Sequence, residues 1–348
     1  MWFGVLVVAA CGRLGFDPPG DGTRPDATSD DGPGDGPRGD APPAVSCGGL
    51  PPTCGPLGTS PCCESPAVTG GMFFRGYDVA ADARYTDASH PATVSGFRLD
   101  KYEVTVGRFR QFVATGSSTQ ASPPVAGAGA RKLNGLANQG GWDTAWNANL
   151  APGVAALSTA LHCGPTYASW TDAPAGNESR PVTCVTWYEA MAFCLWDGGY
   201  LPSEAEAMYA SSGGSLQRAY PWSNPPGDLT IDDARASYFV DATKQCHGDG
   251  IDGCALTDLV RVGSKPAGDG AWGQSELGGN AWEWSLDWQT TPLPDPCDDC
   301  ANLTPSTLRV LRGGAANDAA TFLRAADRGV DAPTTRNERY GIRCARSL

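Results

Sequence analysis

Apolar positions recur at helical spacing behind three polar cap residues of the chain. Thr105 precedes the first set, Thr186 the second and Ser203 the third. A Thr or Ser at such a position accepts a hydrogen bond from the first helical turn, and Glu189 and Glu206 complete a capping box at the second and third. The apolar positions are Val106, Phe109, Phe112 and Val113; Trp187, Ala190, Met191, Cys194 and Leu195; and Ala205, Met208 and Tyr209. Three helices are therefore predicted.

Elsewhere the apolar segments are short and are interrupted by glycine and proline. The chain contains 45 Gly and 29 Pro, and segments such as residues 93–99 and 308–311 are long enough only for brief strands. Together these patterns predict an α+β fold that is rich in loops, with short strands and two or three helices. Such a domain needs staples, which disulfides can provide.

The first eleven residues resemble a bacterial lipoprotein signal peptide that ends at Cys11. The apolar run of residues 3–10 finishes with Val8, Ala9 and Ala10 directly before this cysteine, as in a lipobox. No Lys or Arg precedes the run, which is unusual, and a chance Ala-Ala-Cys is the alternative. No run reaches the roughly 20 apolar residues that span a bilayer, so membrane contact is expected only through acyl chains on Cys11. The expected location is the bacterial cell envelope, periplasmic or surface-exposed, or the secreted fraction.

Three further regions follow this segment. Residues 12–46 consist mainly of Asp, Gly, Pro, Arg and Thr, with too few apolar side chains to offset the entropy of chain ordering, so a disordered linker is predicted. Residues 47–65 form a cysteine-rich segment whose order is expected to come from crosslinks. From residue 66 to residue 348 the composition is mixed and aromatic, which predicts one domain.

Charge and cysteine content narrow the class of function. The 25 basic and 38 acidic residues give a net charge of -13, which repels phosphate backbones and makes nucleic acid an unsuitable partner. Thirteen cysteines accompany only three histidines, a balance that favours disulfides over classical zinc sites and an oxidising compartment over the cytoplasm. If Cys11 is acylated, twelve cysteines remain, and all of them can pair.

The Cys297-Asp298-Asp299-Cys300 sequence has three interpretations: a redox CxxC, half of a zinc site, or a small structural disulfide. A second CxxC or a nearby histidine is missing from the sequence around it. Two adjacent aspartates would raise the pKa of a thiol, whereas a redox cysteine needs a lowered pKa. The structural disulfide is therefore preferred.

A series of segments across residues 66–348 resembles the formylglycine-generating enzyme, or sulfatase-modifying factor, family in order and spacing. The segments are GGMFFRG at 70–76, FRLDKYEVT at 97–105, RPV at 180–182, VTWYEA at 185–190, LPSEAE at 201–206, GGNAWEW at 278–284, RGG at 312–314 and GIRC at 341–344. Taken together they identify a member of this family. The resemblance implies its C-type-lectin-like fold, which agrees with the loop-rich α+β prediction.

Enzymes of this family oxidise a substrate cysteine to formylglycine with two thiolates that hold Cu(I), a soft ion that prefers sulfur. Counted from the Arg-Gly-Gly motif, the corresponding positions here are Asp318 and Leu323. A carboxylate is a hard donor and leucine has no donor atom, and no cysteine lies between Cys300 and Cys344. The chain is therefore expected to be an atypical member without catalytic cysteines, and copper is not expected as a cofactor.

The resemblance also implies a structural calcium ion in the segment around residues 276–283. Side-chain oxygens would come from Glu276, Asn280 and Glu283, and carbonyl oxygens from Gly278 and Ala281. Ca²⁺ takes about six to eight such hard ligands, so the composition suits it. The alternative is a tight glycine turn followed by tryptophans packed in the core.

The family also links the cysteine of its C-terminal motif to the cysteine of its main helix, which implies a bond between Cys194 and Cys344. Cys163 with Cys184, and Cys246 with Cys254, are reasonable further pairs, although the sequence does not fix the connectivity. A bond between Cys194 and Cys344 closes a long loop, for which chain-entropy arguments give roughly 4 to 5 kcal/mol.

Candidate ligand contacts come from two side-chain classes. Arg324 and Arg328 could hold an anionic group, and Trp142, Trp146 and Trp170 could stack on a sugar or a peptide, although core packing is the ordinary role of a tryptophan.

Three functions stay open at this level. The preferred one is an envelope-anchored binding or scaffold module without oxidase activity, whose partner is a protein, a peptide or a glycan. The alternative is a formylglycine-generating or related oxidase that acts on a protein cysteine through an unusual site. The third is a purely structural envelope protein. Whether the chain is an enzyme is therefore left open, with the missing thiols favouring the binding module.

Overall fold

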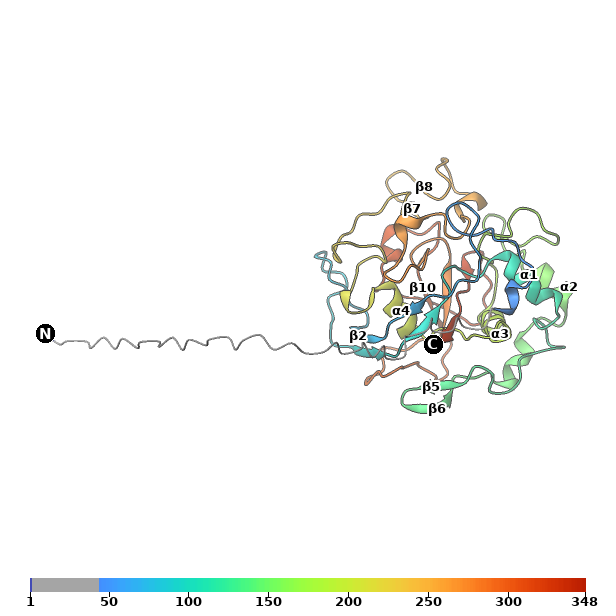
Figure 1. Cartoon of the computed structure of the whole chain (residues 1–348), viewed down its shortest axis with the longest axis horizontal. Coiled ribbons are helices and arrows are strands. Elements are labelled where there is room, and N and C mark those ends of the chain that lie inside the picture. The colour runs from blue at the N-terminus through green and yellow to red at the C-terminus, as the bar shows by residue number, and fades with distance from the viewer. Residues whose placement is uncertain (2–43) are drawn as a thin grey trace, which may run out of the picture. The chain divides into compact units, whose positions relative to one another are not determined.

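The computed structural model describes Met1 and residues 44–348 (Figure 1). The lipobox cysteine, Cys11, and residues 12–43 of the expected linker lie outside the described residues. Residues 44–46, the last part of the expected linker, are ordered: they lead into the 3₁₀ turn η1 (Val45–Cys47), in which Ser46 is fully buried. In this described part, none of the helices has the length and apolar character needed to cross a bilayer.

Residues 44–348 contain four α-helices, one more than the three predicted. They are α1 (Val106–Ala114), α2 (Val154–Ala160), α3 (Trp187–Trp196) and α4 (Glu204–Ser211). The caps are those expected: Thr105 accepts from the backbone of α1, and Thr186 and Ser203 form complete capping boxes with Glu189 and Glu206. The additional helix, α2, begins at Gly153, which has no side chain to signal a cap.

Within this described part of the chain, thirteen short strands form one four-stranded sheet, one three-stranded sheet and three two-stranded pairs. The four-stranded sheet has the order β11-β10-β9-β12, with β12 parallel to β9 and the other pairs antiparallel. The three-stranded sheet, β1-β4-β13, is antiparallel. The strands are β1 (Ala67–Val68), β2 (Gly71–Phe74), β3 (Pro91–Val94), β4 (Phe97–Leu99), β5 (Arg131–Leu133), β6 (Leu136–Gln139), β7 (Phe239–Val240), β8 (Gln245–Cys246), β9 (Trp282–Trp288), β10 (Arg309–Arg312), β11 (Gly329–Asp331), β12 (Tyr340–Gly341) and β13 (Ala345–Ser347).

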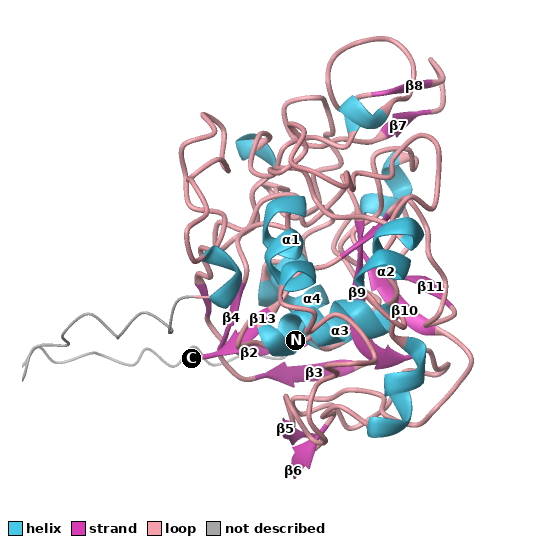
Figure 2. Ribbon diagram, turned by 90° about the vertical axis from the view of Figure 1, so that its right-hand side faces the viewer, coloured by secondary structure: helices cyan, strands magenta, loops and turns pink. Residues whose placement is uncertain are grey.

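Loops connect these elements over most of the chain, and the pairs β5–β6 and β7–β8 project at opposite ends (Figure 2). The segment 93–99, expected to be one strand, is divided between two sheets, because β3 pairs with β2 while β4 pairs with β1 and β13. The break lies at Ser95 and Gly96, where the chain approaches Gly70 closely. A Cβ atom on Gly70 would come within 2.6 Å of the Gly96 nitrogen.

The main core lies between α1, α3 and the four-stranded sheet. Phe109 of α1 stacks on Phe193 of α3 with a centroid separation of 5.7 Å, and Trp187 and Trp284 are fully buried in the same cluster. The indole nitrogens of these tryptophans donate to the carbonyls of Ser285 and Val185, so burial leaves neither indole nitrogen unpaired.

Six disulfides staple this loop-rich fold, and every cysteine among residues 44–348 takes part in one. The pairs are Cys47–Cys63, Cys54–Cys62, Cys163–Cys184, Cys194–Cys344, Cys246–Cys254 and Cys297–Cys300. The three expected pairs, Cys194–Cys344, Cys163–Cys184 and Cys246–Cys254, are among them, and so is the disulfide preferred for Cys297 and Cys300. Cys194–Cys344 joins α3 to the residue directly before β13 across 150 positions of sequence.

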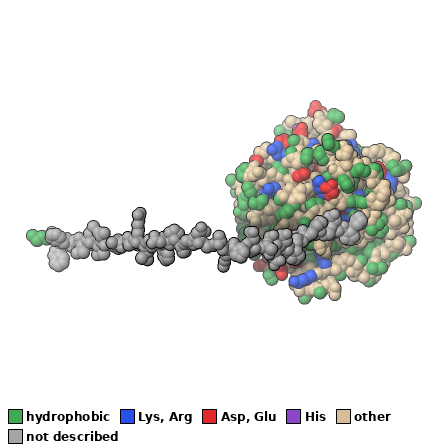
Figure 3. All heavy atoms as spheres, in the orientation of Figure 1, with side chains coloured by type: hydrophobic (Ala, Val, Ile, Leu, Met, Phe, Trp, Pro, Cys, Tyr) green, Lys and Arg blue, Asp and Glu red, His purple; other side chains and the backbone are tan. Residues whose placement is uncertain are grey.

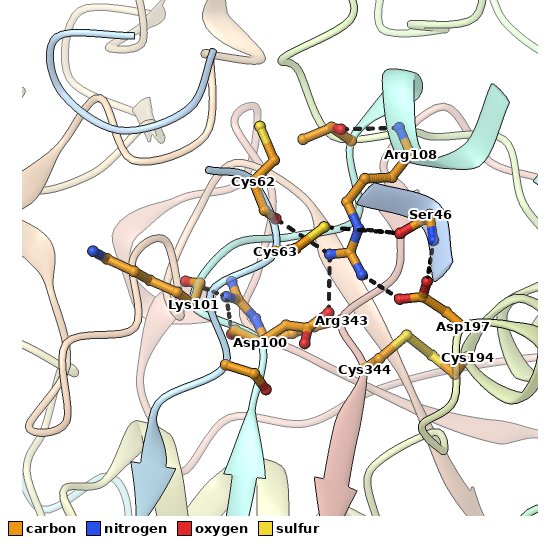
Figure 4. A network of polar contacts seen from close by, with 12 residues as sticks. Ser46, Cys62, Cys63, Asp100, Lys101, Arg108, Cys194, Asp197, Arg343 and Cys344 are labelled. Atoms are coloured by element: carbon orange, nitrogen blue, oxygen red, sulfur yellow. Dashed lines mark hydrogen bonds and ion pairs between the residues drawn. A yellow bond between two sulfur atoms is a disulfide. The ribbon is translucent and has the colours of Figure 1, made fainter. Parts of the chain in front are cut away.

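The cysteine-rich segment is part of the domain and is held by more than its crosslinks (Figure 4). The buried Arg108 guanidinium donates to Ser46 Oγ at 2.9 Å, to Asp100 at 2.9 Å and to Asp197 at 2.6 Å. Arg346 reaches the same two aspartates, so two buried cations face two buried anions. Because its charges balance, this buried network can link the N-terminal segment, α1, the end of α3 and the C-terminal strand β13.

Candidate functional site

The turn after β10 is where the sequence places the family's catalytic positions. Gly313 and Gly314 both have positive φ, 101° and 77°, a conformation that other residues rarely adopt. The turn lies tightly against the 3₁₀ turn η6 (Ala320–Leu323): a Cβ atom on Gly314 would come within 2.8 Å of Leu323 Cδ1. The sequence therefore uses glycine here to bring β10 and η6 into contact.

Asp318 is committed to three hydrogen-bond donors of the chain. Its carboxylate accepts from Trp282 Nε1 at 2.6 Å and from the Ala315 backbone at 3.1 Å, and it pairs with Arg339 at 3.0 Å. Charge-assisted bonds of this kind are stronger than neutral ones. Asp318 thus fastens the turn to β9 and to the segment before β12.

Leu323 is fully buried in an apolar cluster. Its neighbours in that cluster include Tyr220 and Trp222, whose rings stack at 4.9 Å with an interplanar angle of 5°, and Tyr238. Its side chain carries no donor atom, and the aromatic neighbours fill the space around it. The two positions that the resemblance marks for copper therefore hold an ion-paired carboxylate and a packed hydrocarbon.

The two arginines considered as ligand contacts are both engaged within the protein. Arg324 is buried and pairs with Asp78 at 2.5 Å and with Asp82 at 2.7 Å, which raises its already high pKa despite burial. Arg328 is partly exposed and pairs with Glu204 at 2.8 Å. Arg324 is thus a structural cation, and only Arg328 retains an edge toward solvent.

The oxygens of the expected calcium segment are turned toward donors of the chain. Glu276 accepts from the Gly263 backbone with both carboxylate oxygens, at 3.0 and 2.8 Å. Asn280 Oδ1 accepts from the Val260 backbone at 2.8 Å, and Glu283 accepts from Arg343 Nε at 2.8 Å. These contacts spend the side-chain oxygens that a calcium ion needs.

Arg343 supplies the positive charge at this place. It is fully buried, and besides Glu283 it donates to the carbonyls of Asp100, Lys101, Ser275 and Glu276 at 2.8 to 3.3 Å. Among the described residues no group of three or more His, Cys, Asp or Glu side chains is arranged to hold a metal. Four of the five side-chain oxygens of the expected calcium site thus accept hydrogen bonds from the chain, and the site stays a prediction. The carbonyls of Gly278 and Ala281 have no assigned role.

The same segment is rich in buried negative charge. Glu103, Glu276 and Glu283 are all buried around the single Arg343 cation, and Glu103 accepts from Asn280 Nδ2 at 2.6 Å and from the Ala281 backbone. Burial raises the pKa of Glu276 to about 7, and burial together with the nearby Glu276 charge raises the pKa of Glu103. Glu103, which the sequence analysis placed only in the motif at 97–105, is thus part of this cluster.

Known proteins resemble this chain in sequence and in fold. The family described as "Sulfatase-modifying factor enzyme 1-like domain" matches residues 55–348. The chain belongs to this family. Its match begins inside the cysteine-rich segment, in agreement with the buried network that holds this segment to the domain.

Relatives of the sulfatase-modifying factor family differ in what their names state about activity. The formylglycine-generating enzyme of Thermomonospora curvata is 30% identical over 80% of this chain and 92% of the relative. A mouse protein named inactive C-alpha-formylglycine-generating enzyme 2 is 29% identical over 82% of this chain and 87% of the relative. Family membership alone therefore leaves activity open.

A solved structure supports the fold of this family member. PvdO from Pseudomonas aeruginosa superposes with a TM-score of 0.54 at 21% identity, and the match covers 82% of this chain and 95% of that chain. At this identity the likeness concerns the fold alone.

The tryptophans considered as stacking surfaces belong to the core of this family member. Trp142 and Trp170 are buried, and Trp146 packs edge-on against Trp187 at 5.1 Å. Arg309, which no sequence motif marked, belongs to the same core. Its guanidinium lies 3.6 Å from the ring centroids of both Trp187 and Trp288. Burial lowers the pKa of Arg309 to about 9. The faces of the two tryptophan rings attract the guanidinium and stabilise its charge inside the core.

An open cleft of about 760 Å³ lies between the β5–β6 hairpin and the loop that follows β9. Its charged lining residues are Asp295 and Asp298, both exposed, and Asn134, Gln139 and Asn302 contribute amide groups. No motif pointed to this cleft, because its walls come from two distant parts of the chain, residues 134–139 and 294–304. On the face drawn in Figure 3, basic and acidic side chains are interspersed, so that face carries no extended field of one sign.

Proposed function

We propose that this family member does not oxidise cysteine through copper and acts as a binding or scaffold module, held at the bacterial envelope by acyl chains on Cys11. The proposal rests on the absence of free thiols among the described residues. Every cysteine among residues 44–348 is in a disulfide, and the positions marked for thiolates are Asp318 and Leu323. Cu(I) needs soft ligands, and a paired carboxylate and a buried hydrocarbon provide none.

The cleft beside the β5–β6 hairpin supports the binding role. It offers about 760 Å³, within the range of ligand pockets, and its two charged side chains are both carboxylates. A peptide with basic side chains, from a protein partner, or a hydroxyl-rich glycan suits such a lining. A polyanion does not, in keeping with the net charge of -13.

A direct assay tests the absence of oxidase activity. The purified protein is incubated with Cu(I), oxygen and a Cys-x-Pro-x-Arg peptide, and the aldehyde product is sought by mass spectrometry. The Thermomonospora curvata enzyme serves as the positive control. We expect no aldehyde from this chain; its formation would overturn the proposal in favour of oxidation at an unusual site.

A gain-of-function variant tests whether Asp318 and Leu323 mark the copper positions. In Asp318→Cys/Leu323→Cys two thiols become available, one before η6 and one at its last residue. We expect this variant to bind one equivalent of Cu(I), measured by competition with a chromophoric chelator. The single variant Asp318→Cys and the exposed Phe322→Cys are matched controls, since each supplies one thiol. If the double variant binds no more Cu(I) than these controls, the assignment of the two positions fails.

Array binding separates a binding module from a purely structural protein. Peptide and glycan arrays are probed with the protein and with Asp295→Asn/Asp298→Asn, and we expect loss of the bound class in the variant. Asp87→Asn, at an exposed aspartate outside the cleft, is the control. Retained binding in the cleft variant would exclude this cleft as the binding surface.

The anchor is tested separately. Cys11→Ser is expected to move the protein from the membrane fraction to the soluble fraction, measured by fractionation of the source cells. An unchanged distribution would contradict lipidation at Cys11.

A further inference from the structure

The Cys297–Cys300 disulfide lies against a buried arginine from a distant segment. Arg75, directly after β2, is 3% exposed, and its Nη1 donates to Cys300 Sγ at 3.4 Å. Its Nη2 donates to the Pro294 carbonyl, and its Nε has no partner among residues 44–348. The guanidinium is thus aimed at one sulfur of the pair.

Arg75 has no close counter-ion. Within the described residues, no carboxylate comes within the 4.0 Å of an ion pair with it, and burial lowers its pKa. The nearby Glu204 is paired with Arg312 and Arg328 instead. The charges of Glu204, Asp287 and Asp295 favour the cationic form of Arg75 from beyond ion-pair distance. A thiolate on Cys300 would be an anion in direct contact with the guanidinium.

The two cysteines differ in their neighbours. Both are buried, Cys297 at 6% and Cys300 at 2% exposure, and neither lines the 760 Å³ cleft itself. Cys297 has a cleft residue on each side, Pro296 and Asp298, whereas Cys300 has one, Ala301, so Cys297 is taken as the sulfur that a small thiol attacks. The leaving sulfur is then Cys300, the one that receives the hydrogen bond from Arg75, and thiol–disulfide exchange is fastest when the leaving thiolate is stabilised.

We propose that Cys297–Cys300 is a thiol–disulfide exchange site for small thiols such as glutathione. A glutathione thiolate attacks Cys297 Sγ, a bond forms between these two sulfurs, and the Cys297–Cys300 bond breaks with its electron pair on Cys300, as a thiolate held by Arg75. A second glutathione thiolate then attacks the glutathione sulfur, which yields oxidised glutathione and a Cys297 thiolate that takes a proton from water. Two electrons thus pass from two glutathione molecules to the disulfide.

The loop around the pair is held independently of the disulfide, so the thiols stay together after reduction. The Cys297 carbonyl accepts from the Thr93 backbone at 2.9 Å, and the Asp299 backbone donates to the Thr93 carbonyl at 2.9 Å. The Asp299 carboxylate accepts from the backbone and hydroxyl of Ser95 at 2.6 and 2.7 Å. These bonds engage one of the two aspartates that, from the sequence, were expected to disfavour a thiolate.

The order in which the disulfides open tests the proposal. The full chain is exposed to graded reduced glutathione at pH 7, quenched, alkylated, and read out by mass spectrometry for all six pairs, while near-UV circular dichroism confirms that the fold persists. We expect Cys297–Cys300 to open first, about tenfold faster than Cys246–Cys254, whose Cys254 is exposed. If Cys246–Cys254 opens first, or if Cys297–Cys300 opens only as the fold is lost, the proposal is wrong.

Variants of Arg75 test the role of the guanidinium. Arg75→Gln is expected to slow opening about tenfold and Arg75→Lys less, because lysine retains the charge. Arg218→Gln is the matched control, since Arg218 likewise has no ion pair among the described residues and donates to one carbonyl, that of Pro221. An unchanged opening rate in both Arg75 variants would overturn the assignment.

The variant Cys297→Ser tests the same role of Arg75 without a change at the arginine, so this test does not depend on the folding of the Arg75 variants. This change leaves Cys300 as a free thiol beside the intact arginine. Its alkylation rate as a function of pH should titrate below the ordinary thiol pKa of about 8.5. Titration at or above that value would contradict the proposal.

Discussion

The Cys297–Cys300 loop, which precedes β10, and the turn after β10 differ in how sulfur and charge are arranged. In the turn, the family resemblance places thiols, but the chain has Asp318 bound to three donors and Leu323 packed among aromatic rings. In the loop, the sequence suggested an inert staple, yet one sulfur faces a buried cation, Arg75. The difference teaches that the chemistry of a cysteine or of its substitute depends on residues from distant segments, which a motif does not contain.

The two regions also differ in how their buried charges are balanced. In the turn, Asp318 and Arg339 balance each other at 3.0 Å. Beside the loop, Asp287 accepts from the backbones of Glu204 and Asn302, both at 2.7 Å. Burial, followed by the charge of Glu204, raises the pKa of Asp287 to about 7. The turn is therefore closed by packing and pairing, whereas the loop lies close to a carboxyl group that titrates near neutral pH.

The largest effect is expected from Leu323→Ala, which opens a cavity in the turn. Leu323 is fully buried, and truncation of such a leucine typically costs about 3 to 4 kcal/mol in the free energy of unfolding. Urea unfolding measures this cost, with Phe322→Ala as the control because Phe322 is 46% exposed. If the two variants lose similar stability, η6 does not close the turn by packing.

A smaller loss is expected from Asp318→Asn. The change removes the charge that Arg339 pairs with and weakens the bond from Trp282, at a cost of about 2 kcal/mol. The double variant Asp318→Asn/Arg339→Gln isolates the pair, because the second change should cost little once the first is made. Additive losses would show that the two side chains are not coupled and that pairing does not close the turn.

Local features of the fold could be predicted from the sequence. The helix starts at Thr105, Thr186 and Ser203 depend on a cap and a partner within three residues, and each lies where the pattern placed it. The sequence also showed which residues, Asp318 and Leu323, occupy the two positions counted from the Arg-Gly-Gly motif.

The environments of these residues could not be predicted, because they arise from long-range contacts. Arg75 and Cys300 are 225 positions apart, and no periodicity links them. Arg324 was assigned to a ligand although its partners, Asp78 and Asp82, lie more than 240 positions away. The calcium expectation likewise overlooked Arg343, whose contacts to Glu283 and to four carbonyls depend on the folded C-terminus.

The smallest effect, when taken per pH unit, is a pH dependence of stability on the loop side of the comparison. Asp287 has a folded-state pKa of about 7, against an ordinary value of 3.8. Between these values the folded chain retains a proton that the unfolded chain has released, so stability falls as pH rises from about 4 to 7, by at most about 1.4 kcal/mol per pH unit for one proton. The contribution is fully present below the unfolded value and is lost as pH rises through 7.

Urea unfolding between pH 4 and pH 8 measures this term as the difference between the unchanged protein and Asp287→Asn, which has no proton to release. We expect the difference to decline with rising pH and then to level off above 7. Asp298→Asn is the matched control, because Asp298 is an exposed aspartate in the same region and its change should leave the slope intact. A slope that Asp287→Asn does not alter would mean that the loop side is as insensitive to pH as the turn, and the electrostatic contrast between the two regions would disappear.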